Sequence, residues 1–88
     1  MSLEAQFEEA AKKLEQNAGV AGDLPNEKKL EIYSLFKQAK FGDADDSQKP
    51  GMLDFKGKAK FEAWKGKKGT SKEDAMKAYI ELIGDLLG

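Results

Sequence analysis

The sequence contains no cysteine, no histidine and no arginine among its 88 residues, and only two prolines. The absence of cysteine and histidine excludes disulfide bonds, thiolate nucleophiles, zinc sites built on these ligands and imidazole acid–base catalysis. Hydroxyl side chains such as Ser34 therefore have no histidine to activate them. We assign adjacent carboxylates, such as Glu8 with Glu9 and Asp45 with Asp46, to surface or loop charge. We expect a protein that is not an enzyme and that needs neither a metal nor a cofactor.

Long apolar runs and a basic leader are absent as well. The first residues, MSLEAQFEEAAKK, carry acids where a secretory or mitochondrial signal carries basic residues. No apolar run approaches the roughly 18 residues of a membrane span. A chain of 88 residues is close to the smallest size that forms a core without a disulfide or metal. We expect residues 1–88 to form one soluble, cytoplasmic, monomeric domain without stable membrane insertion.

Apolar residues recur at helical spacing along most of the chain, and no segment shows the two-residue alternation of a strand. The sequence therefore predicts an all-α fold with four helices, over residues 3–17, 26–41 and 56–67 and from Thr70 onward. Ser2 is a candidate cap for the first helix and Gly42 a left-handed cap for the second. Thr70 followed by Glu73 is typical of a capping box. The stretches NAGVAGDLP and GDADDSQKPGM are predicted loops.

Charge is distributed unevenly along the sequence. Residues 54–69, DFKGKAKFEAWKGKKG, contain six lysines, three aromatic residues and only two acids, a local charge of +4 within a chain of net charge −1. This separation indicates a docking site for an anion. All fifteen basic residues are lysines, which offer flexible point charges and not the planar fork of arginine, so a flexible polyphosphate fits better than a base edge.

On two of the predicted helices, residues that could bind a ligand are spaced four positions apart. Tyr33 and Lys37 are four residues apart, as are Lys56 and Lys60, so each pair lies on one helix face. Tyr79 has a ring with a polar tip, which commonly lies at the edge between core and solvent. These residues suit a ligand with a planar base and phosphates. Composition alone favours plainer roles, with the lysines on solvated faces and the rings, Trp64 included, as parts of the core.

Three stretches carry a more specific signal: IYSLFKQAKFGD at 32–43, PGMLDFKGKAKFEAW at 50–64 and KGTSKEDAMKAYI at 68–80. In these stretches the chain resembles the acyl-CoA-binding protein family. The resemblance implies an up-down-down-up four-helix bundle. It also implies non-enzymatic binding, intracellular transport and pool formation of medium- to long-chain fatty acyl-CoA esters.

The same resemblance assigns roles to individual residues. Tyr33 would flank the adenine, while Lys37 and Lys60 would hold the 3′-phosphate. Lys56 would reach the phosphates or the acyl end, and Tyr79 would close the nucleotide site from the fourth helix. The acyl chain would lie in an apolar groove, for which the candidate positions are Leu30, Ile32, Phe55 and Ala59.

The sequence departs from the family pattern at several positions. Glu15 stands where the family usually has a lysine that contacts the ligand, which leaves Lys12 or Lys13 as substitutes. Phe36 replaces a frequent tyrosine, so it can contribute packing at the ligand site but no hydroxyl. Lys29 occupies a position that we expect to be apolar, so the groove lining is expected to differ.

Two other classes of function are compatible with the sequence. A nucleic-acid-binding module would explain lysines interleaved with aromatics, although the acidic remainder of the chain argues against it. A helical protein-interaction module without a small ligand is the plainer alternative. We expect long-chain acyl-CoA esters as partners, no nucleic acid, and transient contact with acyl-CoA-using enzymes or membranes.

Overall fold

The computed structural model describes residues 2–87, apart from the side chain of Gln48. Within these residues every regular element is helical, so the all-α prediction is confirmed. None of these helices is both long enough and apolar enough to cross a membrane. In chain order the elements are α1 (Leu3–Gln16), α2 (Ala18–Gly22), α3 (Asn26–Phe41), the 3-10 turn η1 (Asp46–Gln48), α4 (Phe55–Lys65) and α5 (Lys72–Leu87).

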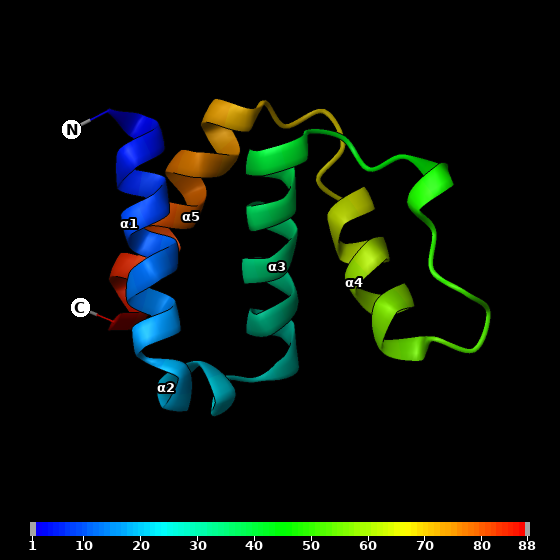
Figure 1. Ribbon diagram of the computed structural model, residues 1–88, viewed down its shortest axis with the longest axis horizontal. Coiled ribbons are helices and arrows are strands. Elements are labelled where there is room, and N and C mark those ends of the chain that lie inside the picture. Colours follow the sequence, from blue (N-terminus) through cyan, green and yellow to red (C-terminus); the bar gives the residue numbers. More distant parts are fainter. Residues whose placement is uncertain (1, 88) are drawn as a thin grey trace.

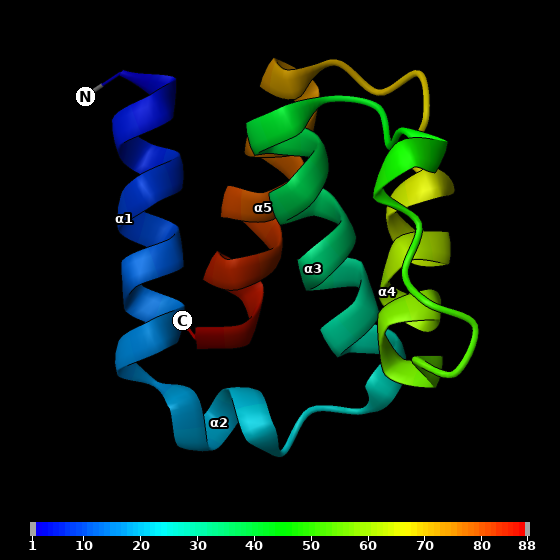
Figure 2. The ribbon, with the colours of Figure 1, turned by 45° about the vertical axis from the view of Figure 1, so that its right-hand side comes forward.

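The four long helices form an up-down-down-up bundle. Helices α1 and α5 run in one direction, and α3 and α4 run in the opposite direction (Figure 1). Helix α5 packs against both α1 and α3, whereas α4 packs against the other side of α3. Turning the molecule shows that α4 and the connection before it lie at the edge away from α1 (Figure 2). Helix α3 is therefore shared between the core on one side and α4 on the other.

The hydrophobic core is made by α1, α3 and α5. The Phe7 ring lies 5.0 Å from the Tyr79 ring and 5.6 Å from the Phe36 ring, centroid to centroid. Burying each large side chain contributes about 1.5–3 kcal/mol, so this cluster is the main source of stability. The buried members of the cluster are Phe7, Ile32, Leu35, Ala39, Ala75, Tyr79 and Ile83.

Of the predicted helix caps, Ser2 is confirmed, Gly42 is confirmed in position and in the sign of φ but is not in the left-handed helical conformation, and Thr70 is wrong. Ser2 Oγ accepts a hydrogen bond from the Ala5 N–H at 3.1 Å. Gly42 ends α3 with φ 80° and ψ −151°, so it has the predicted positive φ but an extended ψ. The capping box at Thr70 is wrong, because Ser71 Oγ accepts the Asp74 N–H at 3.0 Å.

Two hydrogen bonds explain why Thr70 does not cap α5. Its backbone N–H donates to the Lys67 carbonyl at 3.0 Å, and its own carbonyl accepts from Gln38 Nε2 at 2.7 Å. Thr70 is thus held in the turn that follows α4, and α5 begins at Lys72. Two short elements also lie in stretches that we expected to be loops: the five-residue helix α2 and the 3-10 turn η1.

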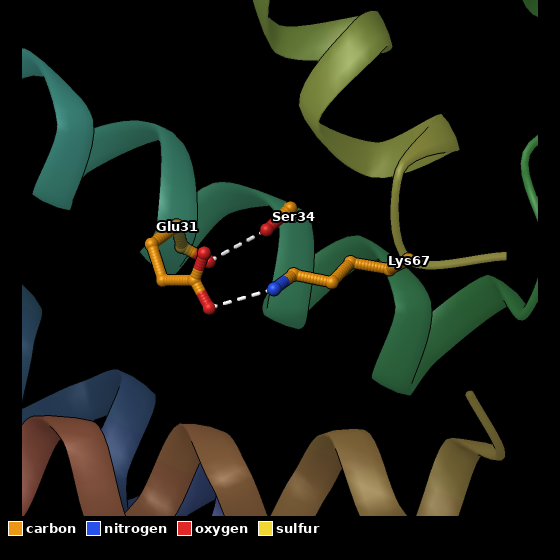
Figure 3. A network of polar contacts seen from close by, with 3 residues as sticks. All are labelled: Glu31, Ser34 and Lys67. Atoms are coloured by element: carbon orange, nitrogen blue, oxygen red, sulfur yellow. Dashed lines mark hydrogen bonds and ion pairs between the residues drawn. The ribbon is translucent and has the colours of Figure 1, made fainter.

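Two groups of polar contacts hold the connection between α4 and α5 against α3. Asp43 Oδ1 accepts hydrogen bonds from Gln38 Nε2 at 2.8 Å and from the Gly69 N–H at 3.0 Å. Nearer the start of α3, Lys67 Nζ lies 2.7 Å from Glu31 Oε1, and Ser34 Oγ donates to the Glu31 carbonyl (Figure 3). These contacts fix where α4 ends relative to α3.

Candidate functional site

A hollow of about 320 Å³ lies between α3 and α4. Its lining combines aromatic side chains, one lysine and two residues from the chain around the start of α4. The lining residues are Tyr33, Lys37, Phe41, Pro50, Gly57, Phe61 and Trp64. The Trp64 indole N–H donates a hydrogen bond of 2.8 Å to the Gly42 carbonyl, which joins α4 to the end of α3.

The α3 wall of the hollow follows from helical periodicity. Tyr33, Lys37 and Phe41 are spaced four residues apart and so lie along one face of α3. From α4, the Trp64 ring meets the Phe41 ring at a centroid distance of 6.2 Å and the Phe61 ring at 6.3 Å. The hollow therefore has flat, rigid walls that suit stacking against a planar ligand.

Two lysines from different helices converge on the Tyr33 ring. Lys37 Nζ lies 5.7 Å from its centroid and Lys60 Nζ lies 5.3 Å from it. Lys37 Nζ also lies 4.8 Å from the Phe41 centroid. Within residues 2–87 the ion pairs are Lys65–Asp46 and Lys67–Glu31, so neither converging ammonium has a carboxylate partner there. Two like charges at one ring repel each other, and a bound anion would relieve that repulsion.

The start of α4 adds to the electrostatic character of the hollow. Asp54 Oδ1 caps the helix by accepting the Gly57 N–H at 2.9 Å. A Cβ at Gly57 would meet the Asp54 carboxylate, so glycine permits this close cap while also lining the hollow. The amino-terminal end of an α-helix carries a partial positive charge, and here the Asp54 carboxylate already occupies it.

Of the six predicted ligand residues, the structure brings three together, leaves Lys56 and Tyr79 apart from them, and places Phe36 at another hollow, described below. Tyr33, Lys37 and Lys60 meet at the hollow, as described above. Lys56 and Lys60 are both exposed on one face of α4 and neither is part of the lining, but only Lys60 has its Nζ over the Tyr33 ring. Tyr79 is only 2% exposed and lies in the core, so the prediction that its ring lies between core and solvent is wrong. Burial raises the pKa of Tyr79 to about 12.

The four acyl-groove candidates do not share one lining. Ile32 is buried in the core, whereas Leu30 is half-buried outside that cluster. Two residues that are two positions apart on a helix face nearly opposite sides, which explains this separation. On α4, Phe55 is 74% exposed and Ala59 is also exposed. The composition of the groove therefore stays a prediction.

A second hollow, of about 240 Å³, lies between α1 and α3. Of the candidate first-helix contacts, Lys12 and Glu15 line this hollow. A different hollow, beside Ile80, is lined by Lys13 and also by Lys12. The complete lining of the hollow between α1 and α3 is Phe7, Glu8, Ala11, Lys12, Glu15, Phe36 and Lys40. Phe36 also lines this hollow, and its ring lies 6.0 Å from the Tyr79 ring, while its packing against a ligand stays a prediction.

Sequence reasoning did not select Phe41, Phe61 or Lys40 as site residues. Phe41 continues the four-residue spacing from Lys37, and this signal could have identified it. Lys40 follows Phe36 at the same interval, and its Nζ lies 5.3 Å from that ring. Trp64 is 4% exposed and also lines the hollow, so it is part of both the packing and the site.

Comparison with known proteins gives consistent results. The family model for acyl-CoA-binding protein matches residues 4–83. The acyl-CoA-binding protein homolog of Manduca sexta is 52% identical over 88 residues, covering 99% of this chain and 93% of the relative. The acyl-CoA-binding protein homolog 1 of Caenorhabditis elegans is 52% identical over 62 residues, covering 70% of this chain and 71% of the relative.

Solved structures that resemble this chain come from the same family as the sequence relatives. The crystal structure of acyl-CoA-binding protein 2 from Oryza sativa matches with a TM-score of 0.85 and 38% identity, covering 98% of this chain and 91% of that one. The crystal structure of the Moniliophthora perniciosa protein matches with a TM-score of 0.79 and 38% identity, covering 99% and 81%. The family model, the relatives and the shared four-helix fold together show that the chain belongs to the acyl-CoA-binding protein family.

Proposed function

We propose that the protein binds medium- to long-chain fatty acyl-CoA esters without chemically changing them, and that it carries and stores these esters in the cell. The observation that supports this most directly is the convergence of Lys37 and Lys60 on Tyr33 at the mouth of an aromatic hollow. Family membership identifies the class of ligand that such a site would hold.

The nucleotide end of the ligand fits the hollow between α3 and α4. A volume of about 320 Å³ is at the lower end for ligand pockets, so the hollow suits one part of an acyl-CoA and not the whole molecule. Tyr33 would flank the adenine, and the two lysines would hold the 3′-phosphate as charge-assisted hydrogen-bond donors. Lys56 and Tyr79 stay proposed contacts, at the phosphates and beside the nucleotide respectively.

The acyl chain would supply most of the affinity. Each methylene transferred from water contributes at most about 0.8 kcal/mol, so ten buried methylenes contribute up to roughly 8 kcal/mol. We therefore expect isothermal titration calorimetry to show far weaker binding of free CoA than of palmitoyl-CoA. Equal affinities for the two ligands would contradict the groove. Binding that strengthens with oligonucleotide length would instead favour the nucleic-acid alternative.

The head-group assignment is tested by changing the protein and the ligand together. Lys37→Met and Lys60→Met should each weaken palmitoyl-CoA binding. Removing the 3′-phosphate from the ligand should weaken binding to the wild type but have little further effect on either variant. Lys77→Met, on the exposed side of α5, is the matched control and should change nothing. If the two variants lose as much affinity for the dephosphorylated ligand as for palmitoyl-CoA, then neither lysine contacts the 3′-phosphate.

A further inference from the structure

A broad groove lies between the first half of α3 and the second half of α5. Its volume is about 540 Å³, compared with about 320 Å³ for the hollow between α3 and α4. We call this groove, between residues 27–35 of α3 and residues 78–85 of α5, the acidic groove. It shares no lining residue with the hollow between α3 and α4, so the proposed function leaves it without a role.

The floor of the acidic groove is apolar. Leu35 of α3 is only 5% exposed, and Ala78 and Leu82 of α5 are half-buried. Ala78 and Leu82 are four positions apart, so they form a row along one face of α5. All three residues belong to the hydrophobic core or pack against it, so the floor is held firmly in place.

The rim of the acidic groove consists mainly of carboxylates. Four of them line the groove against one lysine, Lys28, which gives the lining a formal charge of −3. The carboxylates are Glu27 and Glu31 of α3 and Glu81 and Asp85 of α5. Glu31 is paired with Lys67 at 2.7 Å, as Figure 3 shows. Within residues 2–87 the other three carboxylates have no ion pair, so they can contact a cationic partner.

The acidic groove and the ligand hollow use opposite sides of α3. Glu31 in the groove and Tyr33 in the hollow are two positions apart, a rotation of about 200° around the helix. Charge differs between the two sides as well, because Lys37 and Lys60 meet at the hollow whereas carboxylates surround the groove. A partner in the groove would therefore leave the ligand hollow uncovered.

We propose that the acidic groove docks a basic amphipathic helix of a partner protein. Helices α3 and α5 run in opposite directions, and the groove between two such helices can receive a third (Figure 1). The α3 side of the groove, residues 27–35, is about 12 Å long, which corresponds to roughly two turns of a docked helix. Apolar side chains of the partner would lie on the floor, and its lysines or arginines would contact the rim carboxylates.

Charge complementarity selects this occupant. Anionic lipid head groups and nucleic-acid phosphates would be repelled by the rim, and a wholly apolar helix would leave its carboxylates without partners. A contact over two helical turns is small beside the roughly 800 Å² per partner of a stable interface, so the complex is transient.

The test is fluorescence anisotropy of the full chain with a labelled peptide of leucine, alanine and lysine, about 14 residues long and amphipathic as a helix. We expect saturable binding of one peptide per chain. A peptide with glutamate in place of every lysine should not bind. A peptide of the same composition whose order is not amphipathic should bind at least about tenfold more weakly. Amide shifts in NMR spectra should change at residues 27–35 and 78–85.

Variants of the protein locate the binding. Glu81→Gln combined with Asp85→Asn should weaken peptide binding about fivefold at low salt and less at high salt. Glu4→Gln combined with Glu62→Gln removes the same charge from α1 and α4 and should have much less effect. Ala78→Gln places a longer polar side chain on the floor and should weaken binding at least about fivefold. Circular dichroism checks that each variant is folded.

Three results would overturn the proposal. Equal losses in the two double variants would mean that the peptide responds to net charge and not to the groove. Equal binding of the amphipathic and non-amphipathic peptides would rule out a helix in the groove. Sedimentation could also show oligomers of the chain that Glu81→Gln with Asp85→Asn abolishes, and a second copy would then be the occupant.

Calorimetry of palmitoyl-CoA without peptide separates this proposal from the proposed function. The two titrations are kept apart because a cationic peptide attracts the anionic ester directly. Glu81→Gln combined with Asp85→Asn should leave palmitoyl-CoA affinity unchanged, and a loss would make the groove part of the ligand site and the proposal wrong. If the wild type binds the peptide in the groove but not palmitoyl-CoA, the proposed function is wrong and the docking stands.

Discussion

The indole N–H of Trp64 donates a 2.8 Å hydrogen bond to the carbonyl of Gly42, so the aromatic wall of the hollow is fixed to the end of α3. Trp64→Phe keeps an aromatic ring but leaves this carbonyl without its donor. We expect a loss of about 1–3 kcal/mol in the free energy of unfolding. Thermal denaturation should show a fall in Tm of about 4–8 °C for each kcal/mol lost.

The same substitution should also weaken palmitoyl-CoA binding, because the Trp64 ring forms one wall of the hollow. Phe55→Leu is the control for the loss of an aromatic side chain, since Phe55 is 74% exposed and should leave Tm nearly unchanged. Unaltered stability of Trp64→Phe would show that the hydrogen bond to Gly42 contributes nothing measurable.

Two glycines should respond in opposite directions to alanine. Gly42 has φ 80° and ψ −151°, a conformation that is essentially restricted to glycine, so Gly42→Ala should cost about 1–3 kcal/mol. Gly84 lies within α5, and a Cβ there would meet nothing within 4 Å. Gly84→Ala should therefore stabilise the fold by roughly 0.5–1 kcal/mol. Urea unfolding of both variants checks the two signs, and destabilisation by Gly84→Ala would be the contrary result.

Asp43 should make stability depend on pH in acid. The Gly69 N–H, then the Gln38 side chain and the charge of Lys68 lower the pKa of the Asp43 carboxyl below its usual 3.8. A carboxyl with a lowered native pKa adds stability above its unfolded pKa, and that stability is lost as pH falls through the native pKa. The difference in unfolding free energy between wild type and Asp43→Asn should thus be largest near neutral pH and shrink below about pH 4. Urea titrations over this range measure it, with Asp85→Asn as a control that leaves the Gln38–Gly69 contacts intact. A difference that is constant with pH would contradict the prediction.

Glu15 is expected to weaken ligand binding. It lines the α1–α3 hollow with Lys12 and Lys40, and a carboxylate there repels phosphates that extend toward α1. At an exposed, salt-screened site the repulsion is about 1 kcal/mol, or roughly fivefold in affinity. Glu15→Lys should tighten palmitoyl-CoA binding, more so at low salt, and Glu15→Gln should give part of that gain.

Two lysine variants complete this test by calorimetry. Lys12→Gln should weaken palmitoyl-CoA binding because Lys12 shares the hollow with Glu15. Lys13→Gln should not, since Lys13 is not part of the lining of the hollow that contains Glu15. Unchanged affinity in Glu15→Lys and Lys12→Gln at low salt would mean that the ligand does not reach α1.

Local patterns were sufficient to predict the long helices and part of the site. The apolar periodicity predicted α1, α3, α4 and α5, and the four-residue spacing predicted that Tyr33 and Lys37 share a face. Lys60 approaches this pair from α4, which is separated from α3 by a long connection. Periodicity cannot show such a contact, so here the resemblance to a family supplied the expectation.

The incorrect predictions depend on competing partners that are distant in sequence. Thr70 fits a capping box, but its carbonyl is taken by Gln38, which is 32 positions earlier in the chain. Tyr79 has the composition of a boundary residue, yet Phe7 and Phe36 enclose its ring in the core. In both cases tertiary contacts override a local preference that is itself correct.

The placement of α4 outside the core cluster has a consequence for local unfolding. Because α4 packs against α3 while the core is formed with α1 and α5, α4 can detach without disrupting that core. Its amide hydrogens should then exchange with solvent faster than those of α5. A ligand held between α3 and α4 opposes this detachment, by about 2.7 kcal/mol at a free concentration 100 times its Kd. Slower amide exchange in α4 would therefore report that the ligand is bound.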